Sequence, residues 1–343
     1  MTQTDEAQTV IEVRNLTKRF PVGGLFSKKQ VHALNDVSFS IREGEVVALV
    51  GESGSGKSTT ARLIARLMQP TSGEILFKGK NVLKTEKRGA SLWYRNKVQM
   101  IFQDPFSSLN PVHTIGHHIA RPLALHNKVK WAKQRDARIE ELLSKVGLTP
   151  AREVAQKFPH QLSGGQRQRI AIARALAVDP EIILADEPIS MLDVSIRIGV
   201  LNLMAQLKKD YGIGYLYITH DIASARYIGD KTLVMYAGHM VEGAESTELM
   251  EQPAHPYTQL LLSAVPNPHS LHAPEKLAAR GEIPSLIDPP PGCPFATRCP
   301  KVMDVCREVM PGATQLGADH WVRCHLYGSE PDPAGSPVGA ATA

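Results

Sequence analysis

Residues Gly51–Ser58 read GESGSGKS, and this stretch decides the fold class of the chain. The short apolar run Glu45–Val50 (EVVALV) precedes it and has the composition of a buried parallel strand. The segment that follows, KSTTARLIARLMQ (57–69), is expected to be helical, with one apolar stripe made of Leu63, Ile64, Leu67 and Met68. Strand, glycine-rich turn and helix in this order predict an α/β protein with a phosphate-binding turn.

The residue types in this turn suit the binding of a nucleoside triphosphate with magnesium. Glycines at 51, 54 and 56 let the backbone curl so that successive N–H groups face the phosphates. Lys57 reaches the β and γ oxygens, and Ser58 offers its hydroxyl to Mg²⁺. The residues expected to contact ATP are therefore Gly51, Glu52, Ser53, Gly54, Ser55, Gly56, Lys57, Ser58 and Thr59.

A second apolar run, Ile182–Ala185, ends in the acidic pair Asp186 and Glu187. A carboxylate at the tip of a buried strand can hold magnesium, and a second one beside it can take a proton from an attacking water. We assign Asp186 to magnesium and Glu187 to the catalytic base. The spacing after a phosphate loop favours this over an acidic pair that is merely solvated.

The turn LSGGQ at Leu162–Gln166 opens a second helix. Ser163 is expected to cap that helix, whose apolar stripe contains Ile170, Ile172, Ala173 and Leu176. The helix start then presents backbone donors and a hydroxyl to a phosphate. Because the chain has one phosphate loop, the expected target is ATP on a partner subunit, contacted by Ser163, Gly164, Gly165 and Gln166.

Taken together, these motifs resemble the nucleotide-binding subunits of ABC transporters. The resemblance implies that Phe20, in NLTKRF, stacks on adenine, and that Gln103, in IFQDP, touches magnesium and the attacking water. It also implies that SMLD at Ser190–Asp193 is the D-loop, with Asp193 among the ATP-binding residues, and that His220, in YLYITHD, contacts the γ-phosphate. The apolar run Gly214–Thr219 independently predicts a strand that delivers His220 to the same sheet edge.

The predicted organisation is an ABC-type P-loop ATPase with two additions. Residues 1–265 form the nucleotide-binding domain, which starts with the strands IEVRNLTKRF and VHALNDVSFSI in a mixed sheet. A helical subdomain is expected at about 103–165, where the stretch 130–146 carries a helical stripe of Ile139, Leu142, Leu143 and Val146. Residues 266–328 form a C-terminal extension, and the proline-rich and small-residue tail 329–343 is expected to be disordered.

Two further stretches narrow the resemblance to the ATPases of oligopeptide and dipeptide importers, some relatives of which carry oligosaccharides. These stretches are QDPFSSLNP (103–111) and HPYTQLLLSAVP (255–266). The segment STTARLIARLMQPTSGE is similar to the second of two nonidentical ATPases. The resemblance therefore implies a nonidentical ATPase partner, two integral membrane permeases and an indirect link to an extracytoplasmic solute-binding protein.

The four cysteines, Cys293, Cys299, Cys306 and Cys324, all lie in the extension. The pattern GCPFATRCPKVMDVC followed by HWVRC resembles the extension of these importers, some of which hold a [4Fe–4S] cluster. Four thiolates suit such a cluster or zinc, and unmetallated thiols are the third alternative. The absence of tight CxxC pairs favours iron and sulfur over zinc.

Composition limits the cellular location that we expect for the chain. The 343 residues are 43% hydrophobic, yet no apolar run approaches the ~20 residues that span a bilayer. The polar start MTQTDEAQTV predicts no signal peptide, and the net charge of +5 is modest. We therefore expect a peripheral protein at the cytoplasmic face of the membrane, with no nucleic-acid partner. The competing hypotheses are an ABC ATPase acting on nucleic acid or ribosomes, and an ATPase that senses redox state or iron.

Overall fold

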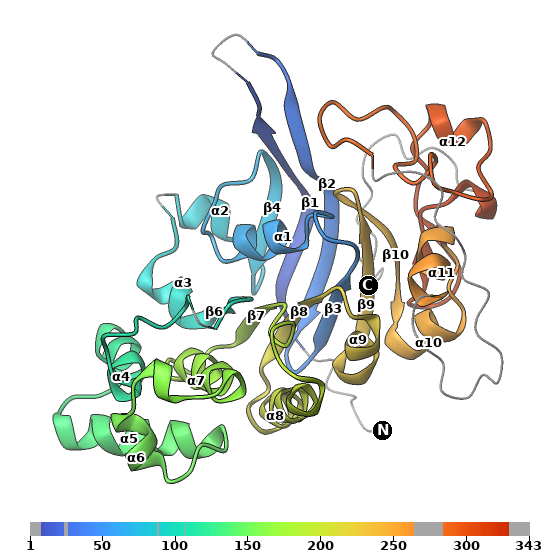
Figure 1. Ribbon diagram of the computed structural model, residues 1–343. Helices are drawn as coiled ribbons and strands as arrows, with labels where there is room; N and C mark the ends of the chain where they lie inside the picture. Colours follow the sequence, from blue (N-terminus) through green and yellow to red (C-terminus); the bar gives the residue numbers. More distant parts are fainter. Residues whose placement is uncertain (1–7, 24–26, 88, 106, 264–283, 329–343) are drawn as a thin grey trace, which may run out of the picture.

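The computed structural model describes residues 8–23, 27–87, 89–105, 107–263 and 284–328 (Figure 1). The expected disordered tail, 329–343, lies outside this range. Within it, no helix combines the length and the apolarity that crossing a membrane requires. Two sheets and the helices packed on them form an α/β fold, as the sequence predicts.

The larger sheet of the described residues has eight strands in the order β11-β12-β10-β9-β3-β8-β7-β6. From β6 to β9 all neighbouring strands are parallel, whereas β10 and β12 add antiparallel pairs at one edge. The strands are β3 (Val46–Val50), β6 (Val98–Ile101), β7 (Ile182–Asp186), β8 (Gly214–Thr219), β9 (Lys231–Tyr236), β10 (His239–Glu245), β11 (Thr314–Gln315) and β12 (Trp321–Val322).

The smaller sheet is antiparallel and separate, in the order β2-β1-β4-β5. Its strands are β1 (Thr9–Pro21), β2 (Gln30–Arg42), β4 (Ser72–Phe77) and β5 (Lys80–Asn81). The two N-terminal strands expected from the sequence therefore exist, but they do not join the sheet that carries the phosphate loop. Periodicity predicts that a segment is a strand without specifying its hydrogen-bonded neighbour.

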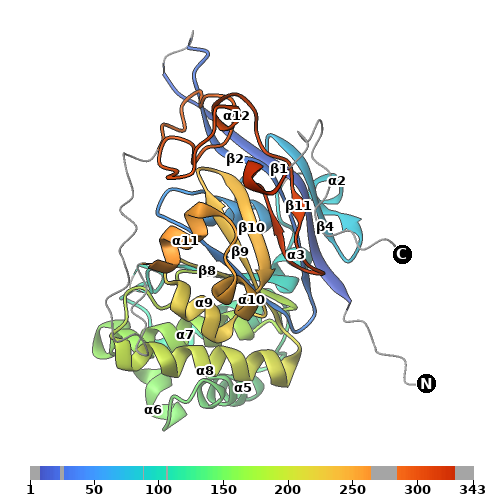
Figure 2. The same cartoon turned by 90° about the vertical axis from the view of Figure 1, so that its right-hand side faces the viewer.

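Helices cover the larger sheet and form a separate group at one end of the molecule, where α4, α5 and α6 lie together (Figures 1 and 2). The helices are α1 (Lys57–Ile64), α2 (Val82–Thr85), α3 (Leu92–Lys97), α4 (Ile115–Leu125), α5 (Ala132–Lys145), α6 (Ala151–Gln156), α7 (Gly164–Leu176), α8 (Val194–Tyr211), α9 (Ile222–Ile228), α10 (Ser246–Glu251), α11 (Pro256–Ser263) and α12 (Val305–Glu308), with 3₁₀ turns η1 (Pro159–Gln161) and η2 (His325–Tyr327).

Both faces of the larger sheet are buried, which explains why its strands are apolar without alternation. On β3, Val46, Ala48 and Val50 pack into the core shared with the helices α7 to α9. Val47 and Leu49 point the other way, into the core shared with α1 and the smaller sheet. The phosphate loop therefore leaves a strand that is held on two sides.

The helix predicted at 57–69 is shorter than expected and ends at Ile64. Arg66 has a left-handed backbone with φ of 57°, and its guanidinium donates to the side chain of Gln69 and to the carbonyl of Glu86. The turn rotates Leu67 into solvent, where it is 57% exposed, so its place on the apolar stripe was wrong. The helix ends just before this left-handed turn, which apolar periodicity does not detect.

The C-terminal extension is attached to the larger sheet through β12 and through a buried charge pair. His320 Nε2 lies 2.8 Å from Glu242 Oε1, and Glu242 is fully buried on β10. The same carboxylate accepts hydrogen bonds from the backbone N–H groups of Ala254 and His255. The hydrogen bond to Glu242 raises the pKa of His320, with a further contribution from the charge of Glu248.

We expect His320→Gln to lower the free energy of unfolding by about 3 kcal/mol, because it leaves a buried carboxylate without its charged partner. Because the pKa of His320 is higher in the folded than in the unfolded chain, its charge contributes fully to the stability of the fold below the unfolded-state pKa of about 6.5. This contribution is lost as the pH rises through the folded-state pKa. The deficit should therefore be larger at pH 6 than at pH 9 in denaturant titrations. Exposed His160→Gln is the control, and a pH-independent deficit would show that His320 is not charged.

Candidate functional site

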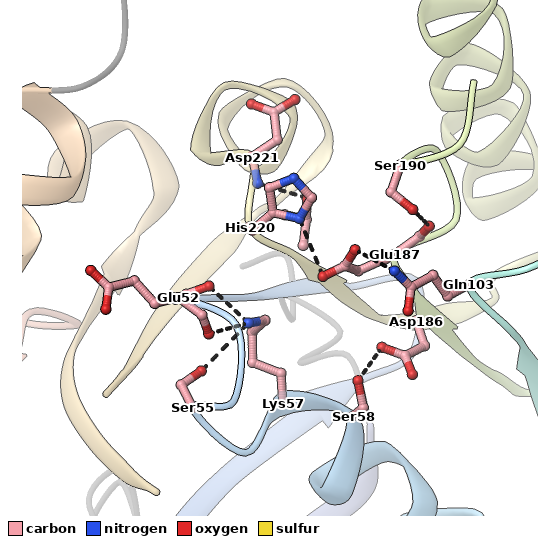
Figure 3. A network of polar contacts seen from close by, with 12 residues as sticks. Glu52, Ser55, Lys57, Ser58, Gln103, Asp186, Glu187, Ser190, His220 and Asp221 are labelled. Carbon is pink, nitrogen blue, oxygen red and sulfur yellow. Dashed lines mark hydrogen bonds and ion pairs between the residues drawn. The ribbon is translucent and has the colours of Figure 1, made fainter. Parts of the chain in front are cut away.

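The carboxyl ends of four parallel strands meet at one edge of the larger sheet and deliver the predicted residues there (Figure 3). The phosphate loop follows β3, and His220 follows β8 directly. Asp186 ends β7 and is followed by Glu187, whereas Gln103 comes two residues after β6. The parallel register aligns these ends, with Val50 opposite Thr219 and Ile101 opposite Ala185.

The phosphate loop is folded so tightly that two of its glycines admit no side chain. Gly51 has φ of 154°, and a Cβ there would lie 2.1 Å from the carbonyl oxygen of Met235. Gly56 has φ of 108°, and its Cβ would lie 2.7 Å from the carbonyl oxygen of Ala33. These contacts give the physical reason for glycine at both positions.

Lys57 lies inside the curl of the loop. Its Nζ donates to the carbonyl oxygens of Gly51 and Glu52, at 2.7 and 2.8 Å. Burial lowers the pKa of Lys57, while the charges of Glu187, Asp186 and Glu52 act in the opposite direction. An anionic triphosphate would favour the charged ammonium still further, so the loop is prepared for a strongly anionic ligand.

Ser58 and Asp186 fit the expected magnesium site. Ser58 Oγ donates to Asp186 Oδ1 at 2.8 Å, which brings a hydroxyl and a carboxylate oxygen together. Burial raises the pKa of Asp186, with the hydrogen bond from Ser58 acting against it. Hard oxygen ligands of this kind suit Mg²⁺, which Ser58 and Asp186 would hold and which would supply positive charge next to the phosphates.

Glu187 lies at the centre of the remaining polar contacts. Gln103 Nε2 donates to its Oε2 at 3.0 Å, and His220 Nδ1 lies 3.2 Å from its Oε1. Its backbone has φ of 47°, a region that non-glycine residues rarely occupy, and Ser190 Oγ donates to its carbonyl oxygen at 3.0 Å. The strained turn directs the carboxylate toward both polar side chains, where it can accept a proton from a water.

A cavity of about 500 Å³ lies in front of these groups. Its lining consists of Ala33, Ser53, Gly54, Gly56, Lys57, Ser58, Thr59, Gln103, Glu187 and His220. Among the described residues, the predicted ATP contacts outside this lining are Phe20, Gly51, Glu52, Ser55, Ser163, Gly164, Gly165, Gln166, Asp186 and Asp193. Their roles as ATP contacts stay predictions. The structure thus brings the residues predicted to bind phosphate, hold magnesium and act as base together within one chain.

The LSGGQ turn has the local structure that the sequence predicts. Ser163 caps α7 by accepting from the N–H of Gln166 at 3.3 Å, and the Gln166 side chain accepts from the N–H of Ser163 at 3.0 Å. Ser163 is exposed, while the stripe Ile170, Ile172, Ala173 and Leu176 is buried. The helix start therefore has its donors at the surface, as a contact with another molecule requires.

Sequence reasoning missed three residues that touch the phosphate loop. The Tyr257 hydroxyl accepts from the N–H of Glu52 at 2.8 Å, and Arg298 pairs with the Glu52 carboxylate at 2.8 Å. The backbone of Ala33 lies beside Gly56. The position of Arg298 directly before Cys299 was a signal, but nothing in the sequence indicated that the cysteine segment lies next to the loop.

These features define a P-loop ATPase of the ABC type, and comparisons with known proteins agree. The ABC transporter family model matches residues 34–190. The dimeric post-hydrolysis structure of the ATP-binding cassette MJ0796, bound to ADP and Pi, aligns with a TM-score of 0.61 and 32% identity, over 69% of this chain and 98% of that one. A cbiO1 structure from Clostridium perfringens aligns with the same TM-score, 26% identity, and coverage of 71% and 92%.

A second family model and relatives that match nearly the whole chain identify the family more closely. The model described as the oligopeptide/dipeptide transporter C-terminal region matches residues 241–306. The oligopeptide transport ATP-binding protein AppF of Bacillus subtilis is 46% identical, over 93% of this chain and 98% of that protein. The dipeptide transport ATP-binding protein DppF of Escherichia coli is 39% identical, over 95% and 97%. The chain belongs to the oligopeptide/dipeptide family of ABC transporter ATP-binding proteins, which are ATPases coupled to transport.

We expect Glu187→Gln to lower ATP turnover by about 10²- to 10⁴-fold, because it removes the proton acceptor and keeps the shape of the side chain. ATP binding should persist, since Lys57 and Ser58 are unchanged. Phosphate release and equilibrium binding of Mg-ATP measure the two effects separately. Glu181→Gln, just before β7 at the other end of the strand, is the matched control and should keep turnover. Wild-type hydrolysis in Glu187→Gln would place the base elsewhere.

Proposed function

We propose that this chain powers an importer of peptides by closing on a second ATPase subunit around bound ATP. The observation that carries the proposal is the division of the ATP contacts. Residues of the phosphate loop and Glu187 line one cavity, with Asp186 bonded to the lining residue Ser58, whereas the exposed Ser163 cap belongs to a helix start outside that lining. The MJ0796 cassette is a dimer in its post-hydrolysis structure, which supports the same arrangement here.

The proposed partners follow from the relatives. AppF and DppF are named as oligopeptide and dipeptide transport ATP-binding proteins, so peptides are the proposed cargo and oligosaccharides the alternative. The complex would contain a nonidentical ATPase, two permeases in the membrane and, indirectly, a solute-binding protein outside it. The chain would lie at the cytoplasmic face of the membrane. The proposed division is residues 1–265 for the nucleotide-binding domain, about 103–165 for its helical part and 266–328 for the extension.

Affinity purification from native membranes tests this proposal. The tagged chain should bring down integral membrane permeases and a second ATPase, and the complex in vesicles should hydrolyse ATP faster when a peptide-loaded binding protein is added. The chain alone should have low activity, because each ATP then lacks its facing LSGGQ turn. Recovery of ribosomes or nucleic acid in place of permeases would support the competing ABC ATPase.

A matched pair of variants tests the shared site within this complex. Ser163→Arg places a bulky cation where the partner's ATP would dock, so hydrolysis should fall while binding of ATP to this chain remains. Ser163→Ala is the control, because it removes the same helix cap, worth about 1 kcal/mol, without adding bulk. If Ser163→Arg removed ATP binding to the isolated chain, the turn would act on the chain's own nucleotide.

We further propose that the four cysteines hold a [4Fe–4S] cluster that stabilises the extension. All four line one small cavity, together with Phe295 and His255. In the described part of the chain, no group of three or more His, Cys, Asp or Glu side chains is placed so that it could hold a metal ion. The gathering of all four thiols at one cavity is therefore the observation that supports the proposal.

The cavity also shows what a metal would change. Burial raises the pKa of the Cys293 thiol to about 12, so the thiol stays protonated when it is not bound to metal. Iron would supply the positive charge that the thiolate form requires. The role proposed for the cluster is structural, since such a crosslink holds a short segment with little regular secondary structure.

Protein purified without oxygen should therefore contain iron and sulfide, and Cys299→Ser should lose both. Residues 292–326 should then become sensitive to protease, because the crosslink is missing. Metal analysis and limited proteolysis measure the two effects. Exposed Arg307→Gln, in the same segment, should keep the iron. One equivalent of zinc, or no metal in oxygen-free preparations, would refute the cluster and leave the ATPase unaffected.

A further inference from the structure

The side chain of Glu52 points away from the ATP cavity although its backbone belongs to the phosphate loop (Figure 3). Its carbonyl oxygen faces inward and accepts from Lys57 Nζ at 2.8 Å. Its carboxylate faces the C-terminal extension, where it receives two hydrogen bonds from Arg298. Nη1 lies 2.8 Å from Oε2, and Nη2 lies 3.0 Å from Oε1.

This ion pair is largely shielded from water. The side chains are 8% exposed for Arg298 and 26% exposed for Glu52. The two parallel hydrogen bonds form the planar fork that guanidinium and carboxylate groups make best. A pair with this geometry and burial is expected to contribute more than an exposed pair on the protein surface.

Aromatic side chains from separate elements hold the pair in place. Arg298 Nη1 also donates to the hydroxyl of Tyr236, at the end of β9, at 3.2 Å. Phe295 packs edge-on against Tyr236, with ring centroids 5.2 Å apart, and contacts Tyr257 of α11 at 5.4 Å. Because Tyr257 also accepts from the N–H of Glu52, the extension and α11 both bind the same loop residue.

Because Glu52 is negatively charged, its contact with Arg298 affects how the loop binds ATP. A carboxylate in the phosphate loop repels the triphosphate and competes with it for Lys57, unless another cation neutralises it and holds it aside. Arg298 does both. We propose that Arg298 is a positioning residue of the ATP site, through which the C-terminal extension keeps the Glu52 carboxylate away from bound phosphate.

The consequence is that the extension and the ATP site are coupled. Arg298 is adjacent to Cys299, so a change that displaces the cysteine segment also releases Glu52. Nucleotide affinity should then fall although no residue of the cavity lining has changed. The inference rests on the ATP-binding site alone, and it requires neither a peptide cargo nor a metal cluster.

Calorimetric titration of the full chain with Mg-ATP tests the proposal. Arg298→Gln should raise the Kd about five- to tenfold, within the usual range for coupled sites. Arg298→Lys should have a smaller effect, since an ammonium restores the charge but not the fork. The double variant Arg298→Gln with Glu52→Gln should recover much of the lost affinity, because the released carboxylate is gone.

Thermal melts distinguish positioning from a merely structural role. A structural role predicts that affinity falls only as the folded fraction falls, whereas positioning predicts weaker ATP binding by a fully folded Arg298→Gln chain and recovery in the double variant. Arg307→Gln is the matched control, an exposed arginine of the same segment, and should bind ATP as the parent does. Parental affinity in Arg298→Gln, or a double variant weaker than either single one, would overturn the proposal. A parent chain that binds no ATP would instead refute the ATPase function.

Discussion

The parallel hydrogen-bonded register of β6, β7, β8 and β3 is the constraint on which the site depends. Each strand runs in the same direction, so all four carboxyl ends emerge at one edge of the sheet. That edge collects the phosphate loop, Asp186, Glu187 and His220 from segments far apart in the chain. Burial on both faces fixes the register, because a slip of one residue would exchange the two cores.

Within this frame, the phosphate loop is held from two directions. Lys57 occupies its inner side, where its Nζ donates to the carbonyl oxygens of Gly51 and Glu52. A triphosphate would replace these oxygens as the acceptor. Arg298 and Tyr257 hold its outer side, through the carboxylate and the N–H of Glu52. The extension is therefore more than an appendage joined by a linker, since its β12 extends the sheet and its Arg298 pairs with Glu52 of the loop.

Several expectations from the sequence depended only on neighbouring residues, and these were confirmed. The three buried strands, the cap at Ser163 and the stripe on α7 follow from local patterns. The helix after the phosphate loop was predicted too long, because apolar periodicity does not detect the left-handed turn at Arg66, whose guanidinium bonds Gln69 and Glu86. The two N-terminal strands were found, but in a separate antiparallel sheet.

The sequence by itself determined the motifs, because the tight turn, the buried strands and their terminal polar residues are encoded within a few positions of one another. It therefore determined the ATPase class and its family. Only the tertiary structure decided which distant groups meet: Gln103 and His220 on Glu187, and Arg298 on Glu52. The pair of Arg298 and Glu52 joins positions 246 apart, and its formation depends on how the whole chain packs.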